Sequence, residues 1–171
     1  MSPGYDDRAD QWLAWARKPD FDAYWRYRDH FFGRIVPAPG RATLEIGCGE
    51  GRVARDLGRR GHTVTAVDAS AVLVASAAEA DPAGRYLVAS AEDLPFDTDD
   101  FDLVVAYNSL MDVGDMPAVV AEAVASWGQA AGLRSASPTH FSMPGGLPDL
   151  LKTRPSSSRA PTSARGGSTT Y

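Results

Sequence analysis

Cysteine and histidine are scarce in this sequence. Its 171 residues include one cysteine, Cys48, and three histidines. A single cysteine excludes an intrachain disulfide and a cysteine-rich metal cluster, so we expect no metal site. Burial of apolar surface must therefore hold the chain together, and the length is sufficient for one domain with a real core.

Long apolar runs are also missing. No run approaches the ~20 residues that a membrane-spanning helix needs. The N-terminus, MSPGYDDRADQW, is too acidic and polar for a signal peptide. These two features predict a cytoplasmic protein without a membrane partner.

Positive charge is sparse in the front part of the chain. Residues 1–127 carry 12 Lys and Arg against 21 Asp and Glu, whereas residues 128–171 carry 5 against a single acid, Asp149. Binding of duplex nucleic acid requires clustered basic groups that displace counterions. We therefore expect no nucleic-acid partner.

Apolar segments alternate with helical patterns through the middle of the chain. Strands are predicted at residues 41–47, 62–68, 85–90 and 101–109. Helices are predicted over 51–60, from Ser70 to about Ala80, and from Met116 to about Trp127. This alternation indicates a doubly wound α/β fold with a parallel sheet, whose ligands bind at the carboxyl ends of the strands.

Aromatic residues gather in residues 8–34, before the first strand. We predict two helices there, interrupted near Pro19, the second capped by Asp20. Phe21, Trp25 and Phe32 share one helical stripe. Two interpretations stay open: the helices pack on the sheet as core, or they form a lid over a ligand pocket.

A glycine-rich loop, LEIGCGEG over residues 44–51, follows the first strand. Its glycines permit a tight turn and a close approach to a ligand. The dinucleotide fingerprint G-x-G-x-x-G would place its third glycine where Arg52 stands. Glu45 and Glu50 flank the glycines and would repel a pyrophosphate. They suit a ligand with a positive charge, such as a sulfonium or an ammonium group.

Asp68 ends the second predicted strand. A carboxylate at this position can accept both hydroxyls of a ribose, and the alternative is that it only caps the next helix. Cys48 also has two interpretations, a small residue that fits the turn or a nucleophile.

Four segments together carry a family resemblance: LEIGCGEG, VTAVDAS, SAEDLPF and FDLVVAYNSLMDV. With them in this order, residues ~1–126 resemble the class I S-adenosylmethionine (SAM) dependent methyltransferases, in particular those with a methyltransferase type 11-like domain. The resemblance implies a Rossmann-like sheet, SAM as the cofactor, and transfer of its methyl group to a small-molecule acceptor.

The resemblance also implies roles for individual residues. The methionine part of SAM would be approached by Gly47, Gly49 and Gly51, with Glu45 near its ammonium group. Asp68 would hold the ribose, and Glu92 and Asp93 would lie beside the adenine. The candidates for orienting an acceptor are Tyr107, Asn108 and Asp112, although Asn108 could serve only to turn the chain and Asp112 only as a cap.

The family pattern stops after the last predicted helix. Its turn, resembling R-V-L-x-P-G-G, and its fifth strand are not found. Residues 124–130 can encode Arg-Val-Leu-Gly-Pro-Gly-Gly when the third base of each codon is read with the first two of the next. We hypothesise a shift of reading frame near residue 124, which puts residues ~125–171 out of frame. A family variant with a divergent tail is the alternative.

This hypothesis defines three segments: a helical lid or packing segment at 1–40, a SAM-binding Rossmann-like domain at 41–127, and a low-complexity tail at 128–171 that we expect to be disordered. The sheet would be incomplete after its fourth strand, leaving that strand as a bare apolar edge. We then expect a catalytically impaired chain. A non-catalytic SAM-binding remnant and a nicotinamide-dependent oxidoreductase are the alternatives.

Overall fold

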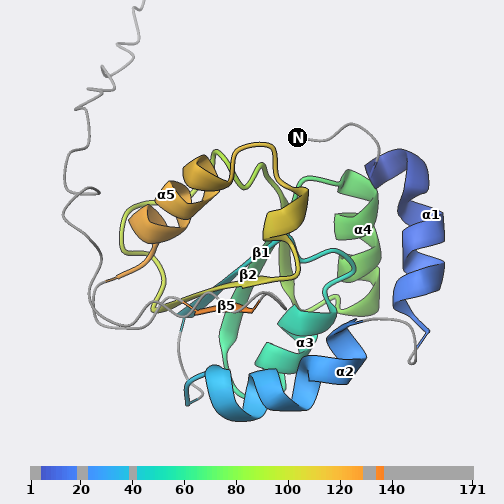
Figure 1. Cartoon of the computed structure of the whole chain (residues 1–171), viewed down its shortest axis with the longest axis horizontal. Coiled ribbons are helices and arrows are strands. Elements are labelled where there is room, and N and C mark those ends of the chain that lie inside the picture. Colours follow the sequence, from blue (N-terminus) through green and yellow to red (C-terminus); the bar gives the residue numbers. More distant parts are fainter. Residues whose placement is uncertain (1–4, 19–22, 39–41, 129–133, 137–171) are drawn as a thin grey trace, which may run out of the picture. The chain divides into compact units, whose positions relative to one another are not determined.

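A computed structural model describes residues 5–18, 23–38, 42–128 and 134–136 (Figure 1). The chain divides into two units, Met1–Phe141 and Ser142–Tyr171, and all the described residues lie in the first. Within these ranges, no helix has the length and apolar character required to cross a membrane.

The described residues form one five-stranded parallel sheet. Its strand order is β3-β2-β1-β4-β5, and each neighbouring pair is parallel. The strands are β1 (Ala42–Ile46), β2 (Thr63–Asp68), β3 (Arg85–Val88), β4 (Leu103–Tyr107) and β5 (Arg134–Ala136). Every residue of β4 is buried, as expected for a strand covered on both faces. The predicted doubly wound α/β fold is confirmed.

Five α-helices flank the sheet in the described part of the chain, and polar side chains cap two of them. They are α1 (Tyr5–Ala16), α2 (Ala23–His30), α3 (Arg52–Gly58), α4 (Ala71–Ala80) and α5 (Met116–Ser126). The Ser70 hydroxyl accepts a hydrogen bond from the Leu73 amide at 3.2 Å, which confirms the predicted cap of α4. Asp115 caps α5 in the same way through the Ala118 amide, at 3.0 Å.

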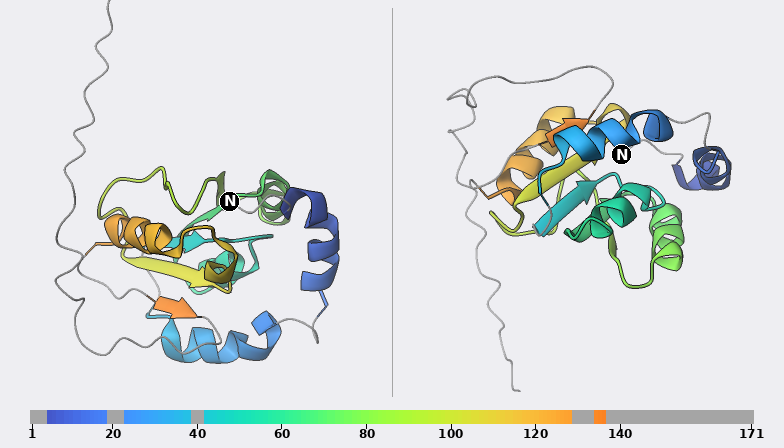
Figure 2. Two further views of the ribbon diagram at one scale, coloured as in Figure 1. Left: turned by 45° about the horizontal axis from the view of Figure 1, so that its top comes forward. Right: turned by 90° about the horizontal axis from the view of Figure 1, so that it is seen from below.

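Two apolar clusters lie on opposite faces of the sheet. On one face, α2 and α3 pack against β4 through residues such as Tyr24, Leu57 and Val105. On the other, α5 packs on β1 and β4 through Val119 and Ala123. The left view of Figure 2 shows β4 and β5 between α5 and α2. Figure 1 shows α1 running beside α4, at the side of the sheet away from α5.

The edge of the sheet differs from the prediction. We expected the sheet to end at β4, but Arg134–Ala136 pairs with β4 in parallel, from Val105↔Arg134 to Tyr107↔Ala136. The backbone of β4 is therefore paired and does not form a bare edge. An unusual sequence can form this pair, because strand pairing depends on backbone hydrogen bonds. The sheet remains short on this side, since β5 has only three residues. β5 also lies inside the segment assigned to the tail.

The predicted aromatic stripe is wrong at Trp25, which is 43% exposed. Tyr24 is buried instead, and Phe31 and Phe32 complete the aromatic core of this face. A π-helical turn over Phe31–Ile35 follows α2 directly and shifts the periodicity that a regular helix would keep. Pro19, Asp20 and Phe21 lie outside the described residues.

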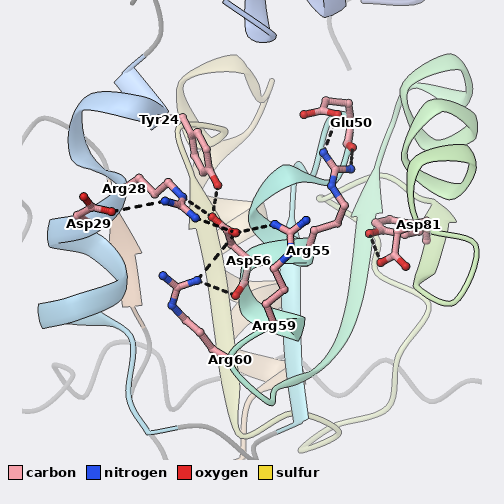
Figure 3. A network of polar contacts seen from close by, with 10 residues as sticks. Tyr24, Arg28, Asp29, Glu50, Arg55, Asp56, Arg59, Arg60 and Asp81 are labelled. Carbon is pink, nitrogen blue, oxygen red and sulfur yellow. Dashed lines mark hydrogen bonds and ion pairs between the residues drawn. The ribbon is translucent and has the colours of Figure 1, made fainter. Parts of the chain in front are cut away.

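A buried carboxylate, Asp56, fastens α2 to α3 (Figure 3). Its oxygens accept hydrogen bonds from the Tyr24 hydroxyl, from Arg28 Nε at 2.5 Å and Nη2 at 3.1 Å, and from Arg59 Nη1 at 2.9 Å. Burial by itself raises the pKa of Asp56, but the hydrogen bonds from Arg28, Tyr24 and Arg59 outweigh it and hold the pKa at about 2.

Removing this charge should loosen α2. Since the pKa of Asp56 is depressed, its stabilising effect is present above about pH 4 and is lost as pH falls toward 2. We expect Asp56→Asn to lower the free energy of unfolding by about 2 kcal/mol at neutral pH. Urea titrations at pH 7 and pH 3 measure this, and the difference between variant and parent should shrink at the lower pH. Asp29→Asn is the control, because Asp29 is 95% exposed; equal effects of the two substitutions would contradict the prediction.

Candidate functional site

A cavity of about 300 Å³ lies at the carboxyl ends of the strands, where the fold predicts a ligand. Its wall combines the loops that follow β1, β2, β3 and β4 with one side of α1. The residues that line it include Asp6, Asp7, Trp12, Gly47, Gly49, Asp68, Ser70, Glu92, Asn108, Ser109 and Asp112.

Asp68 joins two of these loops. Its Oδ2 accepts a hydrogen bond from the Gly49 amide at 2.8 Å, and its Oδ1 accepts one from the Ser70 amide at 2.9 Å. Burial raises the pKa of Asp68, and the Ser70, Gly49 and Ala69 amides oppose that shift. A carboxylate has about four acceptor sites, so acceptor capacity remains for a hydroxyl group of a ligand. The helix-capping alternative does not apply, because the side chain that caps α4 is Ser70.

The first two glycines of the loop lie where a side chain would collide with a neighbouring residue. Gly47 and Gly49 both have positive φ, at 74° and 54°, which glycine adopts without strain. A Cβ built on Gly47 would lie 2.3 Å from Cβ of Ser109, and one on Gly49 would lie 2.7 Å from Cη2 of Trp12. Both residues line the cavity, and their close approach to a cofactor stays a prediction.

Gly51 and Glu50 lie elsewhere. A Cβ on Gly51 would lie 2.7 Å from the Tyr86 ring, so this glycine allows α3 to pack on the sheet, and it is not among the lining residues. Glu50 is not among the residues that line the cavity, and it pairs with Arg55 at 2.8 Å (Figure 3). Its proposed influence on ligand charge therefore has no support in the geometry.

Glu45 is buried beneath the loop and is not among the lining residues. Its Oε2 has no hydrogen-bond partner within the described part of the chain. Burial, followed by the nearby charge of Asp68, raises the pKa of Glu45 to about 8, although a hydrogen bond from the Ala54 amide opposes the shift. Its predicted place near the ammonium group of SAM stays a prediction.

Cys48 is a structural residue of the loop. Its side chain is 5% exposed, and burial together with the charges of Glu45 and Asp68 raises the pKa of its thiol. A thiol is nucleophilic as the thiolate. The environment therefore favours the small-residue interpretation over the nucleophile.

The two acids predicted beside the adenine separate in the structure. Glu92 lines the cavity, and its Oε1 accepts a hydrogen bond from the Asp115 amide at 3.0 Å. Asp93 is exposed and is not among the lining residues. Only Glu92 is therefore placed to contact a ligand here.

Only two of the three candidate catalytic residues line the cavity. Asn108 and Asp112 line the cavity, whereas Tyr107 is buried in the aromatic core, with its ring 4.8 Å from that of Phe31. Strand alternation explains this, since Tyr107 is the last residue of β4 and faces α2. Asn108 has a φ of 54°, a left-handed conformation that is uncommon outside glycine, and such residues gather at functional sites.

Sequence reasoning missed the contribution of α1. Asp6, Asp7 and Trp12 line the cavity, and Asp6 accepts a hydrogen bond from the Ser70 hydroxyl. The only sequence signal was the aromatic content of this segment, which left the lid interpretation open. None of the described residues that line the cavity is a lysine, arginine or histidine. The wall is therefore acidic.

The family described as "Methyltransferase domain" matches residues 44–126, the segment that carries the glycine loop, Asp68, Glu92 and the end of β4. Residues 44–126 belong to this family. The malonyl-[acyl-carrier protein] O-methyltransferase of Salmonella typhimurium is 35% identical over 81 residues, which are 47% of this chain and 32% of that protein. The match thus spans about a third of the length of that relative.

Solved structures show the same architecture. A TehB-like SAM-dependent methyltransferase from Corynebacterium glutamicum is 26% identical with a TM-score of 0.60, over 77% of this chain and 72% of that one. A SAM-dependent methyltransferase from Thermotoga maritima is 21% identical with a TM-score of 0.64, over 77% and 58%. The methyltransferase domain therefore has the fold that the sequence predicted.

SAM is the cofactor that this family implies, and the residues present fit it. Gly47 and Gly49 line the cavity, Asp68 retains acceptor sites, and the acidic side chains of the wall suit a cation. Asp68 would hold the ribose, and Gly47 and Gly49 would face the methionine part. A bound SAM supplies a methyl group activated by a positively charged sulfur.

The burial of Glu45 can be tested without a ligand, through the pH dependence of the stability of the chain. A carboxyl whose pKa is raised in the folded state stabilises below its unfolded value, near 4.5, and this effect is lost as pH rises through about 8. We expect the midpoint of thermal unfolding of the parent to fall between pH 5 and pH 8 more steeply than that of Glu45→Gln. Scanning calorimetry across this range measures it. Glu79→Gln, at an exposed position of α4, is the control and should keep the parent's slope.

Proposed function

We propose that this chain binds SAM in the cavity beside Asp68 and transfers its methyl group to a small-molecule acceptor. One observation supports the proposal most strongly: Asp68 is held by the Gly49 and Ser70 amides, and every charged side chain among the described residues that line the cavity is acidic. Such a wall favours a cationic sulfonium over an anionic ligand. The names of the curated relatives support a methyltransferase activity but do not establish it for this chain, because the matches span a third or less of their length.

The proposed contribution of the protein is positioning. Methyl transfer is an in-line displacement, so alignment of acceptor and methyl group and exclusion of water are the main requirements. Asp68 holds one end of the cofactor, while Asn108 and Asp112, which follow β4 on the other side of β1, are available to orient an acceptor. The Ser109 hydroxyl donates to the Ile46 carbonyl at 2.7 Å and fixes this loop against β1.

The geometry disfavours the nicotinamide alternative. A dinucleotide places its pyrophosphate at the glycine loop, where it needs positive partners or a free helix N-terminus. Here Asp6, Asp7 and Asp68 line the same cavity, and their charges would repel phosphate groups. SAM therefore fits this cavity better than a dinucleotide does.

Titration calorimetry with S-adenosylhomocysteine tests the cofactor half of the proposal. We expect binding by the parent chain, none with NAD, and at least about tenfold weaker binding by Asp68→Asn, because each hydrogen bond to a charged group contributes about 1.5–3 kcal/mol. Asp97→Asn, an exposed carboxylate outside the cavity, is the matched control and should bind like the parent.

The outcomes separate the three functions. Binding of NAD alone would support the oxidoreductase. Binding of S-adenosylhomocysteine without methyl transfer to any of a panel of amine, hydroxyl and carboxyl acceptors would support the non-catalytic remnant. A folded chain that binds neither ligand would overturn the proposal.

A further inference from the structure

Part of the cavity wall comes from outside the matched domain. The family matches residues 44–126, whereas Asp6, Asp7 and Trp12 belong to α1. Among these side chains, Trp12 contacts the glycine loop. A Cβ built on Gly49 would lie 2.7 Å from Cη2 of Trp12 and 3.2 Å from its Cζ3. The edge of the indole ring therefore lies directly against the loop that would receive the methionine part of the cofactor.

α1 has little buried surface of its own to hold it there. Of its described side chains, only Ala9 and Ala16 are buried, both of them small. A helix of 12 residues is marginal in isolation and depends on tertiary contacts. The position of Trp12 must therefore be determined by a few specific interactions.

Arg52 supplies the most direct of these. Its guanidinium carbon lies 5.7 Å from the centre of the Trp12 ring and 4.6 Å from that of Tyr24 on α2. Its Nη1 donates to the carbonyl of Ala16, near the end of α1, at 3.0 Å. One side chain thus contacts α1 and α2 from the first residue of α3, immediately after the glycine loop.

Arginine suits this position for a physical reason. A planar guanidinium stacks on aromatic rings and donates in the same plane, whereas a lysine ammonium is a compact, strongly hydrated charge. Arg52 occupies the position of the third glycine in the dinucleotide fingerprint, so the departure from that fingerprint has a structural consequence here.

We propose that Trp12 is a cofactor-contacting residue that covers the methionine end of bound SAM, and that Arg52 is the positioning residue that holds it over Gly49. The N-terminal helix is then an integral part of the cofactor site. This inference rests on the proposed function, because it places SAM in the cavity.

The first experiment measures the contact with Trp12. We expect S-adenosylhomocysteine to change the tryptophan fluorescence of the parent, and Trp12→Phe to lose most of that change while Trp15→Phe keeps it. Trp15 is the matched control, since it lies on the same helix and is 43% exposed. In calorimetry, Trp12→Ala should bind about tenfold more weakly and Trp15→Ala like the parent.

The second experiment measures positioning by Arg52. Arg52→Ala should weaken binding by about fivefold, and Arg52→Lys by nearly as much, because lysine keeps the charge but not the stacking. Trp12→Ala combined with Arg52→Ala should bind no more weakly than Trp12→Ala alone. Hydrogen exchange of residues 5–16 without ligand should speed up in Arg52→Ala. Arg85→Ala, at an exposed position of β3, is the control and should change neither quantity.

The results distinguish this inference from the proposed function. If the parent does not bind S-adenosylhomocysteine, the proposed function fails. If the parent binds and the Trp12 variants bind equally well, the inference fails and the proposed function stands. Additive losses in the double variant, or full rescue by lysine, would overturn the role of Arg52 while leaving that of Trp12.

Discussion

The arrangement of the site depends on the carboxylate of Asp68. It ends β2, yet it accepts the amide of Gly49 from the loop after β1 and the amide of Ser70 at the start of α4. Two crossovers of the sheet are thereby held at one edge, with the cavity between them. The same atoms that fix the loops are those expected to meet a ribose, so structure and recognition coincide at this residue.

Two buried acids, Asp56 and Glu45, show how hydrogen-bond partners determine the direction in which the pKa of a buried carboxyl moves. Asp56 is 1% exposed and Glu45 is 2% exposed. Asp56 has hydrogen bonds from Tyr24 and two arginines, and its pKa falls to about 2. Glu45 has an oxygen without a partner among the described residues, and its pKa rises to about 8. The first acid stabilises the attachment of α2, whereas the second remains as an unsatisfied group beneath the site.

The helices that precede the matched domain connect these features. Tyr24 of α2 contacts Asp56, and its ring lies over Arg52, which also contacts Trp12 of α1. A continuous set of contacts thus runs from the buried network of Figure 3 to the wall of the cavity. The segment that looked like either core or lid in the sequence divides: α2 packs on the sheet as core, and three residues of α1 line the cavity, so that its role as a lid stays a prediction.

The sequence alone determined β1 to β4, the Ser70 cap of α4 and the place of the glycine loop, because these depend on local periodicity and on backbone conformations that few residues adopt. It also identified Asp68 and Glu92. Tertiary structure decided what pattern could not: that Tyr107 faces the core, that Glu50 pairs with Arg55, and that Asp93 points outside the cavity. It also decided that β5 covers β4 and that Trp12 lies against Gly49. These are contacts between segments far apart in the chain, and their geometry is set by packing rather than by neighbouring residues.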